Sequence, residues 1–394
     1  MRIGIDCRQI WNPEKYEGAG VAHYLFFLLK SLAKIDQQND YFLFFKRGYD
    51  TTQLTFLTSN YHRMTWNPSH GNRLVKFVEQ VHWRSALKKM KLDVFHSPAY
   101  TLPLWYTGAS IVTVHDLAIY THPEWFPEQQ WLSTKVLVPR SIKKATHIIA
   151  VSDTTKKEIE ERFHIPSERI GVIYEGVLST KDFSGISVGE QQTFDKKHEP
   201  QQESIQTLLE HIKDQKYILS VNTLEPRKNM TRLIQAFEHM QHSHPEPLHF
   251  IIAGSLGWKY EEIFRAMKNS PCKQRIHYVG YITQEEKYTL LRNAVVFVCV
   301  SLWEGFGLSN LEAMSCDTPV LASHIPAFRE VLGDAAYFVD PYDVKAIAQG
   351  LQELLTNTKL RRRYQQFGKK RTQEFSWQQC AEQTLRIYNV CRDQ

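Results

Sequence analysis

Two glutamates flank a glycine-containing turn in the segment WEGFGLSNLEAMSCD (303–317). Glu304 follows an apolar run, AVVFVCVSLW (294–303), and Glu312 lies beyond Gly305 and Gly307. Carboxylates accept hydrogen bonds from sugar hydroxyls, and the backbone amides where a helix begins attract phosphate. The spacing therefore predicts a site for a ligand that carries both hydroxyls and phosphates.

Glu312 has a second interpretation that is purely structural. Residues Ser309 to Glu312 fit the capping box S-x-x-E, in which Ser309 would be the N-cap and Glu312 would reach back to its amide. The two interpretations are compatible at Glu312. A helix start does not explain Glu304, which is therefore the stronger candidate for a functional residue.

A basic pair occurs in SVNTLEPRKNM (220–230), after the first strand expected in the second half of the chain. Arg227 and Lys228 could form an ordinary solvated pair on a loop. Their position at the carboxyl end of a strand instead favours contact with an anionic ligand, because ligands of such sheets bind at that edge. The chain contains no D-x-D triplet, so we expect these cations, with the helix start, to neutralise a diphosphate without a metal.

Two motifs of the first half are weaker. TVHDLAIY (113–120) places His115 at the end of an expected strand, where a structural histidine is the alternative. YEGAGVAHY (16–24) places Gly18 and Gly20 before a helical stretch. It fails as a dinucleotide fingerprint because His23 stands where the third glycine is needed. Glycines that let the backbone approach a ligand remain an interpretation.

Short apolar runs alternate with helical patterns along the whole chain, which predicts an α/β fold of parallel sheets covered by helices on both faces. The length of 394 residues and the polar, glutamine-rich stretch 178–204 indicate two Rossmann-like domains, 1–177 and 205–375, joined by a linker. Strands are expected at 2–6, 41–45, 93–97, 110–116, 147–152, 170–176, 217–222, 249–254, 276–281, 295–301, 319–323 and 335–340, and helices at 21–35 and 153–162.

The bulk composition excludes several classes of protein. Six scattered cysteines without a CxxC pair argue against a zinc ribbon or a disulfide framework. No apolar run approaches the roughly 20 residues that span a bilayer, and the first residues carry no signal-peptide pattern, so we expect a cytoplasmic protein. The formal net charge of +6 is compatible with an anionic ligand, but nothing resembles a nucleic-acid-binding module.

Taken in order, the motifs resemble the retaining glycosyltransferases of family 4, which have the GT-B fold. The matches run from EGAGV through VHDL, AVSDTTKKEI, VIYEGV, LEPRKN, AGSLGW and YVG to SLWEGFGLSNLEAM and IPAFREVLGDAAYFVDPYD. The resemblance implies two domains facing each other across a cleft, an acceptor-binding first domain and a nucleotide-sugar-binding second domain. It also implies that the final helix, within 376–394, packs back on the first domain.

The resemblance also implies roles for individual residues. Glu304 would contact hydroxyls of the donor sugar, Glu312 the ribose hydroxyls, and Arg227 and Lys228 the diphosphate. His115 would face the donor sugar. The sequence departs from many relatives at Glu175, where an asparagine is frequent. The remaining residues implied in donor binding are Gly305, Phe306, Gly307, Leu308 and Ser309 at the turn, Tyr281 beside the base, and Gly18 and Gly20 near the phosphate or acceptor.

We therefore expect an enzyme that transfers a hexose from a nucleoside diphosphate to a glycan or lipid-linked glycan, with no metal or other cofactor. The motif variants look most like bacterial mannosyltransferases of surface-polysaccharide biosynthesis, which favours GDP-mannose, and a UDP-sugar remains open. Two alternatives remain: a sugar-nucleotide epimerase of the same fold and a non-catalytic nucleotide-sugar-binding protein. Residues 51–91 hold seven Lys or Arg and one acid, which leaves open a peripheral contact with anionic membranes. Residues 361–371 are most simply a solvated basic helix face.

Overall fold

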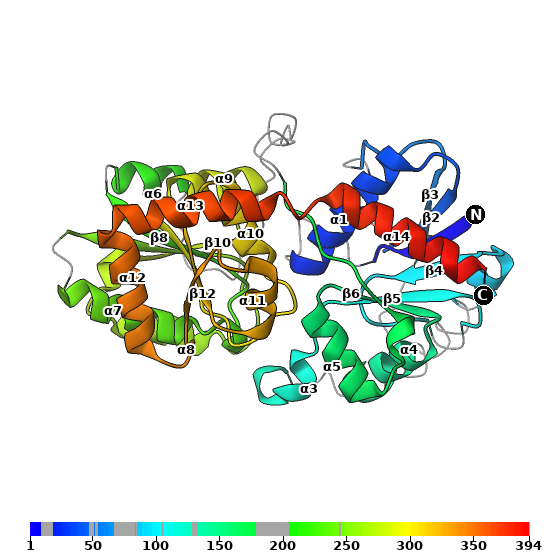
Figure 1. Ribbon diagram of the computed structural model, residues 1–394, viewed down its shortest axis with the longest axis horizontal. Helices are drawn as coiled ribbons and strands as arrows, with labels where there is room; N and C mark the ends of the chain where they lie inside the picture. Colours follow the sequence, from blue (N-terminus) through cyan, green and yellow to red (C-terminus); the bar gives the residue numbers. More distant parts are fainter. Residues whose placement is uncertain are drawn as a thin grey trace. The chain divides into compact units, whose positions relative to one another are not determined.

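The structure is a computed structural model that describes residues 1–8, 19–46, 51, 54–66, 83, 85–103, 106–127, 133–178, 205–213, 215–243 and 246–393. The chain forms two compact units (Figure 1). Unit 1 comprises Met1–Pro123, Pro127–Gly176 and Ser376–Gln394, and unit 2 comprises Glu124–Phe126 and Val177–Phe375. Apart from residue 178, the linker predicted at 178–204 lies outside the described residues.

Unit 1 is built on a seven-stranded sheet in the order β3-β2-β1-β4-β5-β6-β7, and all of its strand pairs are parallel. Most strands are continuous apolar runs because helices cover both faces of a parallel sheet. Its strands are β1 (Arg2–Asp6), β2 (Asp40–Lys46), β3 (Tyr61–Trp66), β4 (Val94–Ser97), β5 (Ser110–Val114), β6 (His147–Ala150) and β7 (Ile170–Val172). Its helices are α1 (Ala19–Ile35), α3 (Ala118–Thr121), α4 (Val138–Lys144), α5 (Asp153–Phe163) and α14 (Trp377–Arg392).

Unit 2 is built on a six-stranded parallel sheet in the order β10-β9-β8-β11-β12-β13. Helix α7 packs against α8 and α12, whereas α10 packs against α9 and α13 (Figure 1). Its strands are β8 (Lys216–Val221), β9 (Leu248–Ala253), β10 (Ile276–Gly280), β11 (Val296–Cys299), β12 (Val320–Ser323) and β13 (Tyr337–Val339). Its helices are α6 (Ile205–His211), α7 (Met230–Ser243), α8 (Glu261–Asn269), α9 (Gln284–Asn293), α10 (Leu308–Ser315), α11 (Pro326–Leu332), α12 (Val344–Thr356) and α13 (Thr358–Thr372).

The predicted class of two parallel-sheet, Rossmann-like domains is confirmed. Every strand expected from the sequence is present, with ends shifted by a few residues, and β3 is an additional strand. Among the described residues, no helix combines the length and the apolar character that crossing a bilayer requires.

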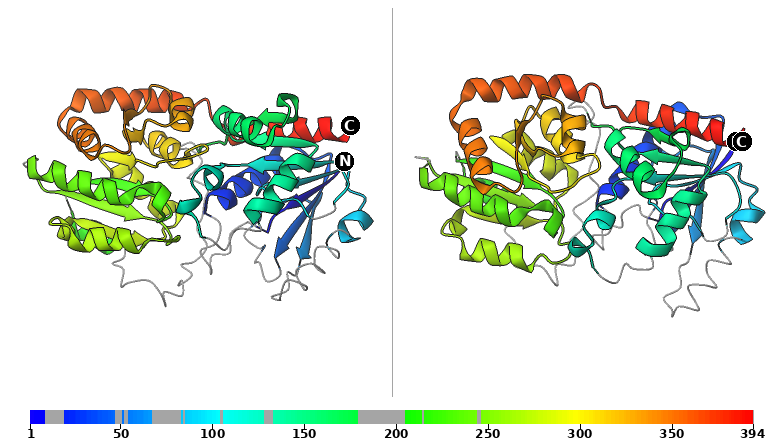
Figure 2. Two further views of the ribbon diagram at one scale, coloured as in Figure 1. Left: turned by 90° about the horizontal axis from the view of Figure 1, so that it is seen from below. Right: turned by 60° about the horizontal axis from the view of Figure 1, so that its bottom comes forward.

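The last helix, α14, belongs to unit 1 and lies against α1 (Figures 1 and 2). Trp377 at its start stacks on Phe27 of α1, with ring centroids 5.5 Å apart. A side chain at Gly176 would overlap the backbone of Trp377, so this close approach requires glycine. Further along α14, Tyr388 Oη lies 2.8 Å from Nδ1 of His96, and both residues are fully buried. The expectation that the final helix returns to the first domain is confirmed.

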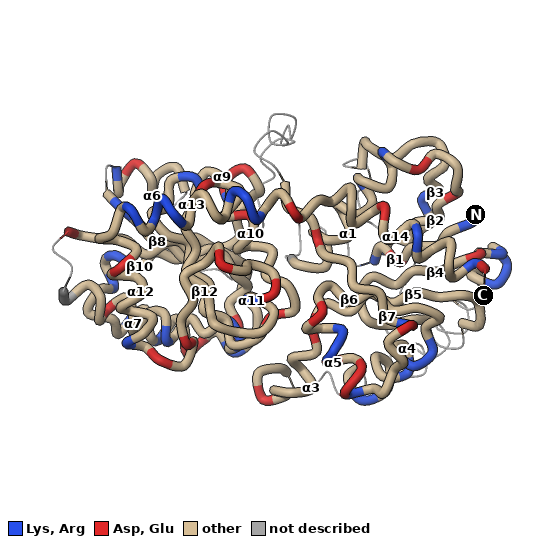
Figure 3. Tube along the Cα trace, in the orientation of Figure 1, with Lys and Arg blue, Asp and Glu red and all other residues tan. Residues whose placement is uncertain are grey.

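Basic residues line α13, as Figure 3 shows. Two of them have a structural task. Arg361 donates to the carbonyls of Leu354 and Leu355 at the end of α12, and Arg371 donates to the carbonyls of Glu330 and Val331 at the end of α11. Cations are stabilising at helix C-termini, where carbonyls lack intrahelical partners. The exposed remainder of the row agrees with a solvated helix face.

Candidate functional site

The turn between β11 and α10 carries the two spaced glutamates. Helix α10 begins at Leu308, and its N-cap is Gly307, with a positive φ of 94° and no side-chain cap. The capping box predicted for Ser309 and Glu312 is therefore wrong. Glycine can adopt this left-handed conformation, so the chain enters the helix before Ser309. A Cβ at position 307 would overlap the ring of Phe328.

Glu304 lies among cations in unit 2. One of its carboxylate oxygens is 2.5 Å from Lys228 Nζ, and the other accepts a hydrogen bond from Arg227 Nη1 at 2.9 Å. The Glu304 side chain is 11% exposed. Burial alone would raise its pKa, but the charges of Lys228 and Arg227 prevail and lower the pKa of Glu304 to about 2. The acid is therefore ionised throughout the physiological pH range.

Hydrogen bonds join the segment after β8 to the exit of β11. The carbonyl of Arg227 accepts from the amide of Leu302 at 2.8 Å. Asn229, at a positive φ of 60°, donates its side-chain amide to the carbonyls of Val300 and Pro341. Strands β8 and β11 are neighbours in the sheet, so these bonds hold the two segments together at its carboxyl edge. Arg227, Lys228 and Glu304 therefore meet at the carboxyl edge of the sheet, in agreement with the expectation that residues following these strands lie together.

Sequence reasoning missed a second acid of this cluster, Glu225. Nε and Nη2 of Arg227 both donate to Glu225 Oε1, at 3.0 and 2.7 Å. Glu225 is 2% exposed, and a buried carboxylate is costly unless a cation compensates it. The sequence did offer one signal for Glu225: it lies two residues before Arg227, within the segment 220–230 that contains the basic pair.

Glu312 also has a cationic partner that the sequence analysis missed. Lys287 of α9 places its Nζ 2.5 Å from Glu312 Oε1, and Tyr288 donates to the same oxygen at 3.4 Å. The Glu312 side chain is only 3% exposed. Nothing in the local sequence marked Lys287, because α9 and α10 are separate elements that meet only in the folded chain.

The other donor-site candidates of unit 2 follow β10 or belong to the turn before α10 and its first residues. Phe306 is buried and its ring packs edge-on against Phe375, with centroids 5.7 Å apart. Tyr281 directly follows β10, and burial, followed by the charge of Glu286, raises its pKa to about 12. Gly305 is buried within the turn, whereas Leu308 and Ser309 are partly exposed in the first turn of α10.

His115 and Gly20 belong to unit 1, whereas the cluster around Glu304 belongs to unit 2. His115 follows β5, with Nδ1 3.3 Å from a carboxylate oxygen of Glu175 and Nε2 2.9 Å from the carbonyl of Pro98. The unusual Glu175 is therefore the partner of the candidate histidine. Gly20 is exposed in α1, and Gly18 lies outside the described residues.

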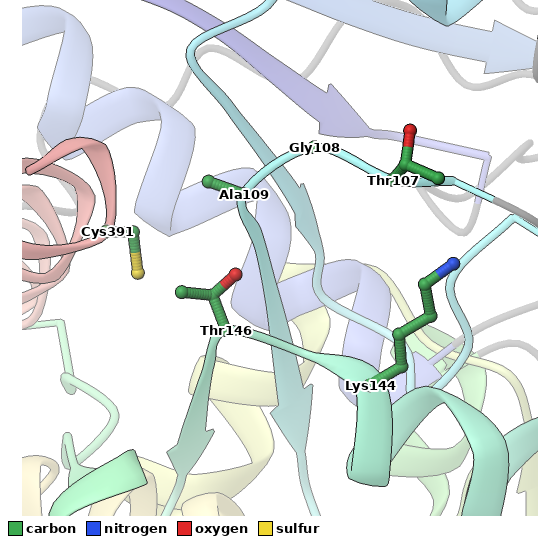
Figure 4. Close-up of a pocket in the computed structure, with 6 residues that line it drawn as sticks. All are labelled: Thr107, Gly108, Ala109, Lys144, Thr146 and Cys391. Carbon is green, nitrogen blue, oxygen red and sulfur yellow. The ribbon is translucent and has the colours of Figure 1, made fainter. Parts of the chain in front are cut away.

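A shallow cavity of about 420 Å³ lies elsewhere in unit 1 (Figure 4). Its lining residues precede β5 and β6, at the amino ends of these strands, except for Cys391 of α14. The candidate residues instead follow the carboxyl ends of their strands. The cavity is thus separate from the predicted site; it is lined by Thr107, Gly108, Ala109, Lys144, Thr146 and Cys391.

The cluster in unit 2 combines the chemistry that a nucleotide sugar requires. Arg227 and Lys228 can neutralise phosphate, Glu304 can accept from hydroxyls, and the start of α10 presents backbone amides. Within the described ranges, no three His, Cys, Asp or Glu side chains are grouped so as to hold a metal ion.

Comparison with family profiles gives a match for each half of the chain. Residues 18–179 match the profile described as Glycosyltransferase Family 4, and residues 201–371 match the profile described as Glycosyl transferases group 1.

Named proteins are similar over the same range. The chain is 28% identical to the O-antigen chain mannosyltransferase B of Escherichia coli over 96% of this chain and 98% of that protein. It is 26% identical to the O-antigen chain mannosyltransferase RfbU of Salmonella typhimurium, over 80% and 78% of the two chains. Among solved structures, the sucrose-phosphate synthase of Thermosynechococcus elongatus matches with a TM-score of 0.76 at 18% identity, over 99% and 98% of the chains. This last match bears on the fold alone.

Proposed function

Because this chain is a glycosyltransferase, built from a family 4 domain and a group 1 domain in the GT-B fold, we propose that it is a retaining enzyme that transfers mannose. The donor is GDP-mannose, and the acceptor is a hydroxyl of a glycan or lipid-linked glycan. The names of the two relatives above support mannose and a surface polysaccharide. A UDP-sugar is the alternative donor.

The observation that carries the proposal is the cluster of Glu304 with Lys228 and Arg227. In the proposed reaction, the diphosphate replaces Glu304 as the partner of the two cations, which stabilise the charge that develops as this group leaves. Glu304 is then available to accept from hydroxyls of the sugar. Cations and backbone amides do the work that a metal does in other enzymes, so the proposed reaction needs none.

Two more residues complete the assignment. Glu312 accepts from the ribose hydroxyls, and His115 contributes to the donor sugar site from unit 1. No side chain is assigned as a covalent nucleophile, so the residues act by positioning the substrate and by electrostatic stabilisation. The proposed site of action is the cytoplasm, with a peripheral contact to anionic membranes that co-sedimentation with anionic vesicles at low salt tests directly.

The test is incubation of the full chain with a panel of nucleotide sugars, with and without a lipid-linked glycan acceptor and with and without EDTA. Acceptor-dependent release of GDP that EDTA leaves unchanged is the expected result. Conversion of the nucleotide sugar without acceptor would identify an epimerase, and binding without turnover a binding protein.

A pair of variants connects this activity to the site. Glu304→Ala is expected to lower transfer by orders of magnitude while the protein remains folded, because the acceptor for the sugar hydroxyls is lost. Glu262→Ala removes an exposed acid of α8 in the same unit and is expected to leave the rate unchanged. Near-normal transfer by Glu304→Ala would refute the assignment.

A further inference from the structure

We propose that Glu225 is a positioning residue of the nucleotide site. It fixes the guanidinium of Arg227, and it limits how strongly the site holds a nucleoside diphosphate. This inference rests on the proposed function, because it takes the diphosphate as the ligand of Arg227. It concerns a buried acid that the reaction itself does not use.

The contacts of Arg227 show how its guanidinium is held. One edge, Nε and Nη2, donates to Glu225 Oε1 at 3.0 and 2.7 Å. On the other side, Nη1 donates to Glu304 Oε2 at 2.9 Å and to the carbonyl of Trp303 at 3.0 Å. A planar guanidinium bonded on two sides has little freedom to rotate. When a substrate draws Glu304 to its hydroxyls, the Glu225 edge remains as the anchor.

The Glu225 carboxylate is buried, and its Oε1 already accepts from Nε and Nη2 of Arg227. Its backbone is also fixed. The preceding residue, Leu224, donates to the carbonyl of Ser255 and accepts from the amide of Gly257, and the carbonyl of Glu225 accepts from the amide of Lys228 at 3.1 Å. Glu225 therefore acts on the ligand through the position of Arg227 and through its own charge.

The formal charges of the cluster give Glu225 its second effect. Arg227 and Lys228 contribute two positive formal charges, and Glu225 and Glu304 contribute two negative ones, so the four side chains together are formally neutral. A diphosphate brings further negative charge to this place. With the Glu225 carboxylate on Arg227, the attraction for the diphosphate is smaller than the two cations alone would produce. Weaker retention favours release of the nucleoside diphosphate after transfer, a step that limits many enzymes.

A purely structural acid would behave differently. Loss of a structural group loosens the segment after β8 and weakens every ligand contact. Loss of the charge alone, with the geometry kept, strengthens binding of the diphosphate and slows its release. The direction of the change in affinity therefore distinguishes the two roles.

Two matched variants separate the effect of the negative charge at position 225 from the effect of the length of the side chain. Glu225→Gln keeps an acceptor oxygen at the same length but removes the charge, and we expect GDP to bind roughly tenfold more tightly while kcat for transfer falls. Glu225→Asp keeps the charge but shortens the side chain by one methylene. For this variant we expect GDP affinity within about twofold of the unchanged protein and at least about tenfold slower transfer, because the guanidinium is displaced.

The experiment is isothermal titration of the full chain with GDP, and with UDP in parallel, together with initial rates of transfer. Glu262→Gln is the control for removal of one negative charge from unit 2 and is expected to change GDP affinity by less than about twofold. In an Arg227→Met background, Glu225→Gln is expected to cause no further fall in the rate of transfer, because the guanidinium that Glu225 positions is gone.

Unchanged or weaker GDP binding by a folded Glu225→Gln protein would overturn the inference, as would an equal further fall in the rate of transfer in the Arg227→Met background. If Glu225→Gln does not fold, Glu225→Asp decides, and transfer at the unchanged rate would overturn it. An unmodified protein that binds neither GDP nor UDP would instead refute the proposed function, so the two failures are distinguishable.

Discussion

Protonation of Glu304 is expected to remove a defined part of the stability of unit 2. Burial and the flanking charges of Lys228 and Arg227 set the pKa of this carboxyl at about 2 in the folded protein, against 4.5 ordinarily. With about 1.4 kcal/mol for each tenfold change in proton affinity, the difference corresponds to about 3 kcal/mol. The contribution is complete above pH 4.5, because the unfolded chain binds the proton more tightly, and it disappears as the pH falls towards 2.

The assay compares the unmodified protein with Glu304→Gln by urea unfolding at a series of pH values. The two units can unfold separately, so the transition of unit 2 is followed by hydrogen exchange of the β11 amides in samples pulsed at each urea concentration. The unmodified protein is expected to be more stable by about 3 kcal/mol at pH 7, and the gap is expected to close below pH 3. Taking the difference between the two proteins cancels the other carboxyl groups.

A gap that stays constant from pH 7 to pH 2 would refute the reasoning, because it would show that the ion cluster does not depend on the ionised Glu304. The exposed Glu262→Gln serves as the control, for which no closing gap is expected. A constant gap between the unmodified protein and Glu304→Gln would also remove the electrostatic basis for assigning Glu304 to the site.

Four further substitutions test other parts of the structure. Asn310→Leu is expected to raise the free energy of unfolding by about 1–3 kcal/mol, because within the described residues neither amide atom of this fully buried side chain has a hydrogen-bond partner; lower stability in urea would contradict this. Gly307→Ala is expected to lower the free energy of unfolding by about 1–3 kcal/mol and to weaken GDP binding. Gly20→Ala, where an added Cβ meets nothing within 4 Å, is expected to stabilise α1 slightly. Equal shifts of the two variants in thermal melts would refute the distinction. Tyr388→Phe leaves Nδ1 of His96 without its 2.8 Å partner, so we expect about 1–3 kcal/mol lower stability and faster hydrogen exchange in α14, and unchanged exchange would argue against this anchor.

The sheets were readable from the sequence because their strands are uninterrupted apolar runs between turn residues. β11 is such a run, and all of its residues are buried. β3 was missed because it lies at the edge of its sheet and is largely polar, with His62 and Arg63 exposed. An edge strand covered on fewer sides does not need the apolar signature on which the prediction depended.

The candidate site was only partly readable, for a different reason. Glu304, Arg227 and Lys228 were found because each follows a strand end, and parallel strands bring such ends together. The partners Glu225 and Lys287 were missed because a cation in the sequence does not show which acid it meets. The start of α10 was misplaced because the positive φ of Gly307 is a backbone property that a glycine permits but does not impose.

The return of α14 to unit 1 has a consequence for synthesis of the protein. Translation produces the first 176 residues before the main part of unit 2, Val177–Phe375, whereas α14 is made after it. The buried contact of Tyr388 with His96 cannot form until α14 has left the ribosome. Domains commonly fold in the order in which they are made; here the second can complete its core first, while the first waits with the surface that α14 covers still exposed. We therefore expect the N-terminal half to depend on chaperones during translation, until α14 can pack against it.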